Sequence, residues 1–317
     1  MPTDAPVIAA IVPCHNEEAA ISQVVHDLFD TVPGIQVYVY DNLSTDATVE
    51  VARAAGAEVR FENNKGKGNV VRRAFADIDA DVYLLIDGDD TYDVSAAPAM
   101  IEALLDGPYD HVLGVRKQVT STAYRPGHSA GNRAFNRLVS GIFKSEVNDM
   151  LSGYRVFSRR FVKSFPAISR EFEVETELTV HSMSLRVPQT EIEVGFKDRP
   201  EGSESKLNTY RDGFKILSLI FELTRHERPL MFHGIVGALF AIAALVLGIP
   251  VIVEFVQTGL VPRFPTALLA ASLAIVSALI LLIGFVLDGT TRARREVARL
   301  VYLGFAAPSR STSRLSE

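Results

Sequence analysis

The sequence predicts an α/β fold with a mostly parallel sheet and helices on both faces, followed by two membrane-spanning helices. Between residues 6 and 86, short apolar runs alternate with helical patterns and short loops, which is typical of βαβ units. In the last third, residues 231–256 and 266–287 form two long apolar segments. Each is longer than the roughly 20 residues that span a bilayer. The chain therefore combines an α/β domain with a C-terminal membrane anchor.

The expected strands and helices of the α/β domain follow in close order. We expect strands at residues 6–12, 36–40, 57–61 and 82–86, and a further apolar run at 111–115. Helices are expected after residue 18, before residue 56, from the stretch 63–69 through residue 75, and across 129–143. The first helix is predicted from apolar residues at helical spacing, namely Ile21, Val24, Val25 and Leu28. Because helices connect successive strands, these strands run parallel in one sheet.

Composition excludes several classes of protein. The 317 residues carry a net charge of −6 and the pI is about 5.7, so we expect no nucleic-acid partner. Cys14 is the single cysteine, which excludes an internal disulfide and a cysteine-based zinc site. Mean hydropathy is +0.17, and the apolar excess lies in the last third. The first residues lack a basic region and lead directly into a strand, so no signal peptide is expected.

The two apolar segments also predict an orientation in the plasma membrane. Both are apolar all round rather than on one face, which favours membrane spans over a buried hairpin of a soluble core. Basic residues flank their outer ends: Arg211, Lys215, Arg225 and Arg228 before the first, and Arg292, Arg294, Arg295 and Arg299 after the second. The connecting loop offers Arg263. The distribution predicts that the α/β domain and both termini are cytoplasmic.

An amphipathic helix is expected between the α/β domain and the spans. Residues 210–225 mix apolar side chains with Arg211, Lys215 and Arg225, a pattern that fits a helix lying on the cytoplasmic leaflet. A core helix of the soluble domain is the alternative. The expected domains are 1–200 for catalysis, 201–230 for the linker and interfacial helix, 231–289 for the spans, and 290–317 for a basic tail.

Three carboxylates at the end of the strand expected at 82–86 mark the candidate site. That strand ends in Asp87-Gly88-Asp89-Asp90, and its glycine permits a sharp turn or the close approach of a ligand. Open α/β sheets bind ligands at this edge. Mg²⁺ and Mn²⁺ take one or two carboxylates and complete their shell with phosphate oxygens. An Asp-x-Asp pair therefore suits such a metal, and a solvated acidic turn is the alternative.

Polar residues at other strand ends favour the metal-site interpretation. Asp41 ends the second strand, where an acid can accept hydrogen bonds from a ribose or a base edge. Gly66 and Gly68, with Lys67 between them, open a helix and suit a phosphate, although their spacing is not that of a P-loop. Glu17 is either a ligand-binding residue at this edge of the sheet or an acid in the first turn of a helix, where it complements the helix dipole. All lie at the same edge of the expected sheet.

Three short motifs occur in the first 90 residues, at 12–17 (VPCHNE), 40–46 (YDNLSTD) and 87–89 (DGD). In this order and spacing they resemble the family 2 glycosyltransferases, which have the Rossmann-like GT-A fold. Residues 149–155 (DMLSGYR) resemble the Asp-x-x-Ser-Gly-[Phe/Tyr]-Arg signature of its polyprenyl-phosphate branch. That branch includes dolichol-phosphate mannose synthases and GtrB- and ArnC-like enzymes, and two C-terminal spans match the latter.

The resemblance implies roles for the residues at the sheet edge. By this resemblance, Pro13, Glu17 and Asp41 would contact the base and ribose of the nucleotide, and Lys67 would contact its diphosphate. Asp87 and Asp89 would bind the cofactor, Mg²⁺ or Mn²⁺, and through it the diphosphate. In the mannose synthases a further metal ligand lies two residues after the second aspartate. Thr91, a poorer ligand, occupies that position here, and Asp90 is a candidate substitute.

Arginines are the expected acceptor-binding residues. A lipid phosphate is already ionised near neutral pH, so its binding beside an anionic donor needs cations rather than a strong base. The candidates are Arg116, Arg133, Arg137 and Arg155, together with Ser152 of the signature. For each arginine the alternative is a solvated position, and for Arg155 a further alternative is to hold the loop at 152–153.

The implied activity is that of an inverting hexosyltransferase. It moves one sugar from UDP-glucose, UDP-N-acetylglucosamine or GDP-mannose to undecaprenyl or dolichyl phosphate, and homo-oligomers occur in the resembling group. One alternative is a family 2 enzyme with another acceptor, such as a polysaccharide synthase. Two spans are few for a polymer channel, and the chain has no tryptophan for the later Trp-containing motif of those enzymes. The other alternative is a non-catalytic nucleotide-sugar-binding membrane scaffold, which the intact aspartate pair disfavours.

Overall fold

A computed structural model describes residues 5–118, 148–167, 173–197, 221, 225–226 and 228–310. By internal contacts the chain divides into two compact units. The first unit is Met1–Asp212 with Val297–Glu317, and the second is Gly213–Glu296. The helix expected at 129–143, with Arg133 and Arg137, lies outside the described residues, as does most of the amphipathic helix expected at 210–225.

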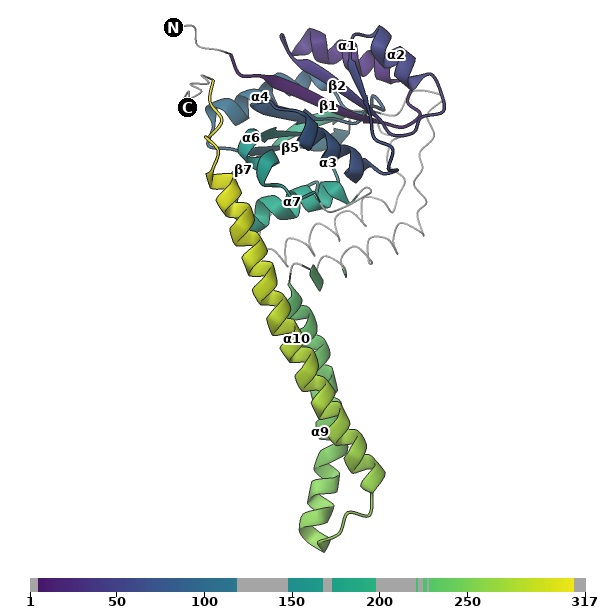
Figure 1. The fold of residues 1–317 in the computed structure, drawn as a ribbon, viewed down its shortest axis with the longest axis vertical. Coiled ribbons are helices and arrows are strands. Elements are labelled where there is room, and N and C mark those ends of the chain that lie inside the picture. Colours follow the sequence, from purple (N-terminus) through teal and green to yellow (C-terminus); the bar gives the residue numbers. More distant parts are fainter. Residues whose placement is uncertain are drawn as a thin grey trace. The chain divides into compact units, whose positions relative to one another are not determined.

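The first unit is built on a seven-stranded sheet in the order β3-β2-β1-β4-β6-β5-β7 (Figure 1). The strands are β1 Ile8–Cys14, β2 Gln36–Asp41, β3 Glu58–Phe61, β4 Val82–Leu85, β5 His111–Gln118, β6 Arg155–Ser158 and β7 Gln189–Phe196. The neighbouring pairs are parallel, except that β6 runs antiparallel to both β4 and β5. The mostly parallel sheet predicted from the alternating pattern is confirmed.

Helices connect the parallel strands as expected. Those of the first unit are α1 Ile21–Thr31, α2 Thr48–Ala54, α3 Lys67–Asp77, the 3₁₀ turn η1 Val94–Ala96, α4 Ala97–Asp106, α6 Arg159–Ser164 and α7 Val174–Leu185. The buried side chains of α1 include Ile21, Val24, Val25 and Leu28, the four apolar positions from which this helix was predicted. Their spacing places them on one face, which packs on the sheet.

Two hydrophobic cores cover the two faces of the sheet. Successive side chains of a strand point to opposite faces, so Ala10 and Val12 of β1 lie in one core while Ala9 and Ile11 lie in the other. The first core includes residues of α1, α2 and α4, and the second includes residues of α3, α6 and α7. Burial on both faces explains why the strands are continuous apolar runs rather than alternating ones.

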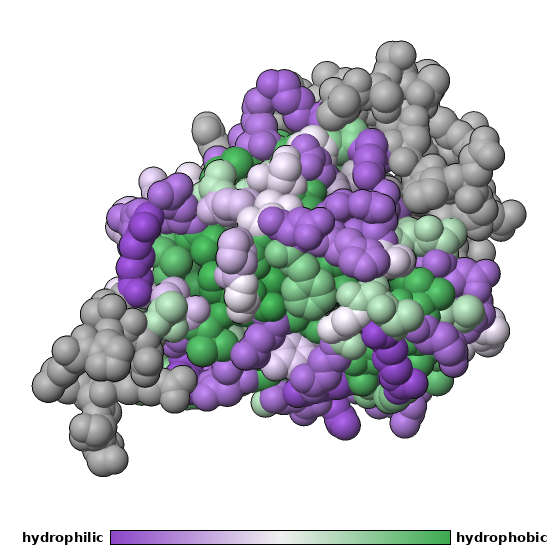
Figure 2. Space-filling view, turned by 90° about the horizontal axis from the view of Figure 1, so that it is seen from above, coloured by the Kyte–Doolittle hydropathy of each residue, from purple (hydrophilic) through white to green (hydrophobic). Residues whose placement is uncertain are grey.

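The second unit contains two helices long and apolar enough to cross a membrane, α9 Pro229–Thr258 and most of α10 Phe264–Leu303. Small residues bring the two helices together, since a side chain at Gly237 would clash with Leu281, and the Ser277 hydroxyl donates to the Gly237 carbonyl at 2.8 Å. Their other faces expose large apolar side chains, including Val256 and Phe285. By contrast, Figure 2 shows hydrophilic residues spread between hydrophobic ones on the face of the first unit that it presents.

The last residues of α10 and the segment after it belong to the first unit. Tyr302 is buried, and its hydroxyl donates to Asp110 Oδ2 at 2.6 Å. Asp110 is fully buried at the start of β5, where it also accepts a hydrogen bond from Ser158 at 2.6 Å and two from Arg160 at 2.5 Å. The Arg160 guanidinium neutralises this buried carboxylate, and four hydrogen bonds satisfy its oxygens, which is the condition for burying a charge at acceptable cost.

Candidate active site

The aspartate cluster lies immediately after β4, at the carboxyl end of the parallel strands. Gly88 is required there because a side chain would clash with the Cys14 sulfur and crowd Val12 of β1. Asp89 is buried, and its Oδ1 accepts hydrogen bonds from the Thr91 amide at 3.2 Å and the Thr91 hydroxyl at 2.6 Å. The backbone thus turns sharply against β1 and holds the Asp89 carboxylate in one orientation.

The two residues weighed as an additional metal ligand have other partners. The Thr91 hydroxyl donates to Asp89, and Asp90 forms an ion pair with Lys197 at 2.8 Å. Within the described part of the chain, no group of three or more His, Cys, Asp or Glu side chains is arranged to hold a metal. Two carboxylates, those of Asp87 and Asp89, fit a hard divalent ion that takes its remaining ligands from a diphosphate.

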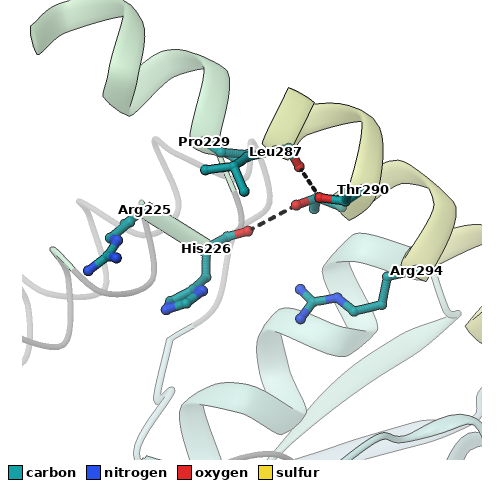
Figure 3. A pocket seen from close by; sticks show the side chains of 7 residues that line it. Arg225, His226, Pro229, Leu287, Thr290 and Arg294 are labelled. Atoms are coloured by element: carbon teal, nitrogen blue, oxygen red, sulfur yellow. Dashed lines mark hydrogen bonds between the residues drawn. The ribbon is translucent and has the colours of Figure 1, made fainter. Parts of the chain in front are cut away.

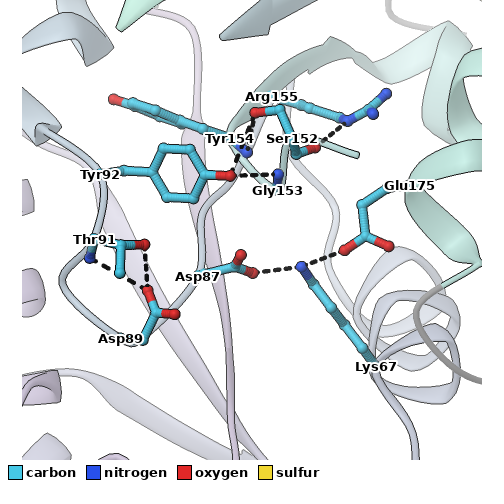
Figure 4. A network of polar contacts seen from close by, with 10 residues as sticks. All are labelled: Lys67, Asp87, Asp89, Thr91, Tyr92, Ser152, Gly153, Tyr154, Arg155 and Glu175. Atoms are coloured by element: carbon cyan, nitrogen blue, oxygen red, sulfur yellow. Dashed lines mark hydrogen bonds and ion pairs between the residues drawn. The ribbon is translucent and has the colours of Figure 1, made fainter. Parts of the chain in front are cut away.

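Lys67 joins the aspartate cluster to α7 (Figure 4). Its ammonium forms ion pairs with Asp87 Oδ1 and with Glu175 Oε1, the latter at 2.5 Å. Burial alone would lower the pKa of Lys67, but the charges of Asp87 and Glu175 outweigh it and raise the pKa above its ordinary value. Burial raises the pKa of Glu175, and Lys67 opposes that shift. Lys67 is therefore a buried, permanent cation next to the Asp-x-Asp pair.

The signature loop at 149–155 packs directly against Asp87. A side chain at Gly153 would clash with the Asp87 carboxylate, so this glycine permits the close approach. Tyr92 fixes the loop, because its hydroxyl accepts a hydrogen bond from the Gly153 amide at 2.8 Å. Burial raises the pKa of Tyr92 to about 12, which keeps its hydroxyl protonated. The antiparallel pairing of β4 with β6, where Leu85 faces Arg155, brings the two motifs together.

Arg155 is fully buried, and its contacts are those of a loop-holding residue. Its guanidinium donates to the carbonyls of Ser152 at 2.8 Å and Met150 at 2.6 Å, and to the Thr179 hydroxyl at 2.8 Å. Burial lowers its pKa to about 10, so it remains a cation at neutral pH. Of the two roles considered for Arg155, these contacts favour holding the signature loop. Ser152, also buried, donates weakly to the Tyr92 hydroxyl at 3.5 Å.

Arg116, the other expected acceptor arginine that is described, lies in β5 and binds Asp149. Two parallel hydrogen bonds join them, Nε to Oδ2 at 2.6 Å and Nη2 to Oδ1 at 2.7 Å. The guanidinium also lies over the ring of Phe196, 5.4 Å from its centroid. This bidentate pair orients Arg116 from the first residue of the signature. Its role toward an acceptor phosphate stays a prediction, as does that of Arg133, which lies outside the described residues.

The residues expected to contact the nucleotide lie at the ends of β1 and β2 and at the start of α3. Asp41 ends β2, is buried, and accepts a hydrogen bond on Oδ2 from the Ser44 amide at 3.3 Å. Its Oδ1 is buried without a hydrogen-bond partner among the described residues. An oriented acceptor atom with no protein donor is suited to a ligand hydroxyl or N–H.

Asn42 shapes the loop that leads into α3. Its amide nitrogen donates to the carbonyls of Glu62 at 2.7 Å and Asn64 at 2.8 Å, and its oxygen accepts from the Gly66 amide at 2.7 Å. Gly66 has φ +125°, a conformation that side chains rarely adopt. Lys67, the first residue of α3, thereby follows a loop fixed from the end of β2.

Acidic residues from three strand ends converge around Cys14. Burial raises the pKa of its thiol well above the ordinary value, and the charges of Glu17, Asp41, Asp87 and Asp89 raise it further. Pro13 precedes it at the end of β1, and the Glu17 amide donates to the Thr48 hydroxyl at 2.8 Å. The strand ends that a parallel arrangement brings together therefore carry several acidic side chains at one edge of the sheet, and a metal ion would offset part of their charge.

Three residues of this site were not singled out from the sequence. Glu175 resembles an ordinary first-turn helix acid, and Tyr92 an ordinary apolar residue after a turn. Asp149 was noted as part of the signature but not as the partner of Arg116. A glycine at position 153 suggests that another group packs closely against that loop. The sequence does not indicate that this group is the Asp87 carboxylate.

The family model for glycosyl transferase family 2 matches residues 9–165. The glycosyltransferase AglJ of Haloferax volcanii is 35% identical over 261 residues, which cover 80% of this chain and 83% of AglJ. The chain belongs to glycosyltransferase family 2. A dolichyl-phosphate hexose transferase of the same organism is 28% identical over 221 residues, covering 70% of this chain and 95% of that protein.

Solved structures show the same fold. Glucosyl-3-phosphoglycerate synthase from Mycobacterium tuberculosis, crystallised with Mn²⁺, UDP and glucosyl-3-phosphoglycerate, superposes with a TM-score of 0.57 at 21% identity. The match covers 69% of this chain and 79% of the synthase. The catalytic unit therefore has a GT-A-like fold, as the motifs implied.

Proposed function

We propose that this protein is a membrane-anchored, inverting glycosyltransferase that moves one sugar from a nucleotide-sugar to a polyprenyl phosphate. The observation that carries the proposal is the junction of Asp87, Asp89 and Lys67 with the signature loop at Gly153, in a chain that also contains two helices apolar enough to span a bilayer. A water-soluble acceptor would not require such helices. The relative named dolichyl-phosphate hexose transferase supports a lipid-phosphate acceptor.

Different residues of the chain bind the two anionic substrates, the nucleotide-sugar and the acceptor phosphate. Asp41 accepts a hydrogen bond from the nucleoside, and Lys67 supplies positive charge beside the diphosphate. Asp87 and Asp89 would hold a divalent cation, and support for a metal comes from the Mn²⁺ in the glucosyl-3-phosphoglycerate synthase complex. When bound, this ion supplies neutralisation of the charge on the leaving diphosphate. Arg116, which Asp149 orients, binds the acceptor phosphate in this proposal.

The reaction is a single displacement at the anomeric carbon. An oxygen of the acceptor phosphate forms a bond to that carbon while the bond to the diphosphate oxygen breaks, and the nucleoside diphosphate leaves with the electron pair. An α-linked donor therefore gives a β-linked lipid-phosphate sugar. The phosphate is already ionised near neutral pH, so no side chain has to remove a proton, and positioning of the two substrates contributes much of the acceleration.

A donor screen tests the proposal. The full chain in detergent is incubated with undecaprenyl phosphate, Mg²⁺ or Mn²⁺, and in turn UDP-glucose, UDP-N-acetylglucosamine and GDP-mannose, and the lipid fraction is analysed by mass spectrometry. We expect a glycosyl-phosphate lipid from one donor, and its loss on addition of EDTA. Binding of a nucleotide-sugar without any lipid product would contradict the acceptor assignment.

The variant Asp89→Asn tests the metal pair in the same assay. It removes a charge while keeping the side-chain size, so we expect turnover to fall by about 100-fold or more with the protein still folded and membrane-bound. Asp79→Asn is the matched control, since Asp79 pairs with Arg159 on the exposed surface. Near-wild-type turnover of Asp89→Asn would overturn the assignment of Asp89 to the metal.

A further inference from the structure

The second unit contains a basic pocket of about 280 Å³ (Figure 3). Arg225 and His226 line it from the segment before α9, and Arg294 lines it from α10. One threonine hydroxyl connects these two walls, since Thr291 donates to the His226 carbonyl at 3.3 Å. Neither the metal pair nor the signature loop contributes to this pocket, and the proposed transfer reaction does not use it.

The chemistry of the pocket suits an anion. The guanidinium of Arg294 provides a planar set of N–H donors that matches the oxygens of a phosphate, and the imidazole of His226 adds a second nitrogen group, whereas the guanidinium of Arg225 points away from Arg294 (Figure 3). The 30-residue helix α9 begins at Pro229 in the pocket wall, and the unpaired N–H groups of a helix N-terminus favour negative charge. Asp288, the nearest acid before Thr290 on α10, is paired with Arg292 at 2.6 Å.

The pocket also has an apolar side, which identifies the kind of anion. Pro229 and Leu287 complete its lining, and they lie at the ends of the two long apolar segments. Beyond them, exposed apolar side chains such as Ile235 and Ile283 continue along α9 and α10. A small soluble anion has no use for such a surface. A lipid would place its phosphate beside Arg294 and His226 and its hydrocarbon chain along the helices.

We propose that this pocket binds the phosphate group of a membrane lipid. The shared chemistry is a phosphate ester on a hydrocarbon chain, which both a polyprenyl phosphate and an anionic phospholipid carry. The proposal rests on the membrane anchoring proposed above, but not on the transfer reaction. A failed donor screen would therefore leave it standing, and a failed binding test would leave the transferase assignment standing.

The test compares two arginines of the same helix. Both side chains are exposed, but Arg294 lines the pocket and Arg292, which forms an ion pair with Asp288, does not. The full chain in detergent is titrated with undecaprenyl phosphate, with phosphatidylglycerol and with inorganic phosphate, and bound lipid is counted by native mass spectrometry. For Arg294→Gln we expect the lipid Kd to rise about tenfold, and further for Arg225→Gln/Arg294→Gln. Arg292→Gln should change it less than about twofold.

The three ligands distinguish the source of the phosphate. Site-dependent binding of undecaprenyl phosphate alone would identify an acceptor-docking site, and binding of both lipids would identify a general anionic-lipid site. Competition by inorganic phosphate would show that the headgroup suffices for recognition. A lower lipid Kd for Arg294→Lys than for Arg294→Gln would show that binding depends on the positive charge at position 294 in a folded pocket. An equal rise in the lipid Kd for Arg294→Gln and Arg292→Gln would overturn the proposal, and so would an unchanged Kd for both variants. In either case diffuse surface charge would explain any binding.

Discussion

Lys67 lies between two carboxylates, those of Asp87 in the loop after β4 and of Glu175 in α7. A buried lysine without such partners would be driven toward its neutral form, and a buried carboxylate would be driven toward protonation. The charges of Asp87 and Glu175 raise the pKa of Lys67, so this residue stays a cation where a diphosphate is expected to bind. Glu175 touches no reacting atom in this scheme, so we regard it as a positioning residue. Its Oε2 is buried without a hydrogen-bond partner among the described residues.

Replacement of Glu175 by glutamine tests this positioning. The change keeps the side-chain volume but removes the charge that pairs with Lys67. We therefore expect the KM for the nucleotide-sugar to rise and kcat/KM to fall by about tenfold. Steady-state kinetics of the lipid-product assay measure both parameters. Glu177→Gln, two residues later on α7 and only half-buried, should stay near wild type. Equal kinetics for both variants would remove Glu175 from the site.

At the scale of elements, one reversed strand and one terminal segment determine the architecture of the catalytic unit. The reversed strand β6 places the signature loop beside Asp87, because a chain entering β6 from 149–154 reaches the sheet edge where β4 ends. The terminal segment places Tyr302 on Asp110 at the start of β5. Arg310 adds exposed ion pairs to Asp106 and Glu102 at the end of α4, which contribute little to stability.

Tyr302→Phe measures the contribution of the terminal segment. The variant leaves the ring in place but removes one of the donors to a fully buried carboxylate, at a cost of about 1–2 kcal/mol. We expect the Tm of the purified protein to fall by roughly 5 °C. Tyr38→Phe is the matched control, since that hydroxyl bonds Gln36 in an exposed position. An unchanged Tm for Tyr302→Phe would mean that the segment does not stabilise the unit.

At the scale of the whole molecule, the chain joins a GT-A-like catalytic unit to a pair of apolar helices. The arginines that flank these helices predict that both termini lie in the cytoplasm, where nucleotide-sugars are made available. The short loop between Thr258 and Phe264 is then external. Cys14 is buried, so the natural protein presents no accessible thiol and gives a low background for topology mapping.

Single introduced cysteines test this orientation. Val261→Cys lies in the loop between the helices, and Ala307→Cys lies in the segment after α10; both positions are exposed. With a membrane-impermeant maleimide on intact cells, we expect labelling of Val261→Cys and none of Ala307→Cys. Permeabilised cells should label both, which controls for reactivity. The reverse pattern in intact cells would place the catalytic unit on the outer side.

Much of the fold was predictable because it depends on local patterns. Apolar runs identified β1, β2, β3 and β4, and the apolar positions of α1 proved to be its buried face. The parallel arrangement of these strands then placed Asp41 and Asp87 at one edge without further information. The aspartate pair, its glycine and the signature were visible as residues. Their mutual contacts were not.

The sequence by itself determined the class of fold, the edge of the sheet that carries the site, and the two apolar helices, since each follows from periodicity or composition within a short stretch. Tertiary structure decided that Lys67 pairs with Glu175, 108 positions later in the chain, and that Arg155 is enclosed rather than presented to a substrate. The physical reason is that such contacts depend on how helices and strands distant in sequence pack against one another. No local pattern encodes that packing, because it minimises the free energy of the whole unit.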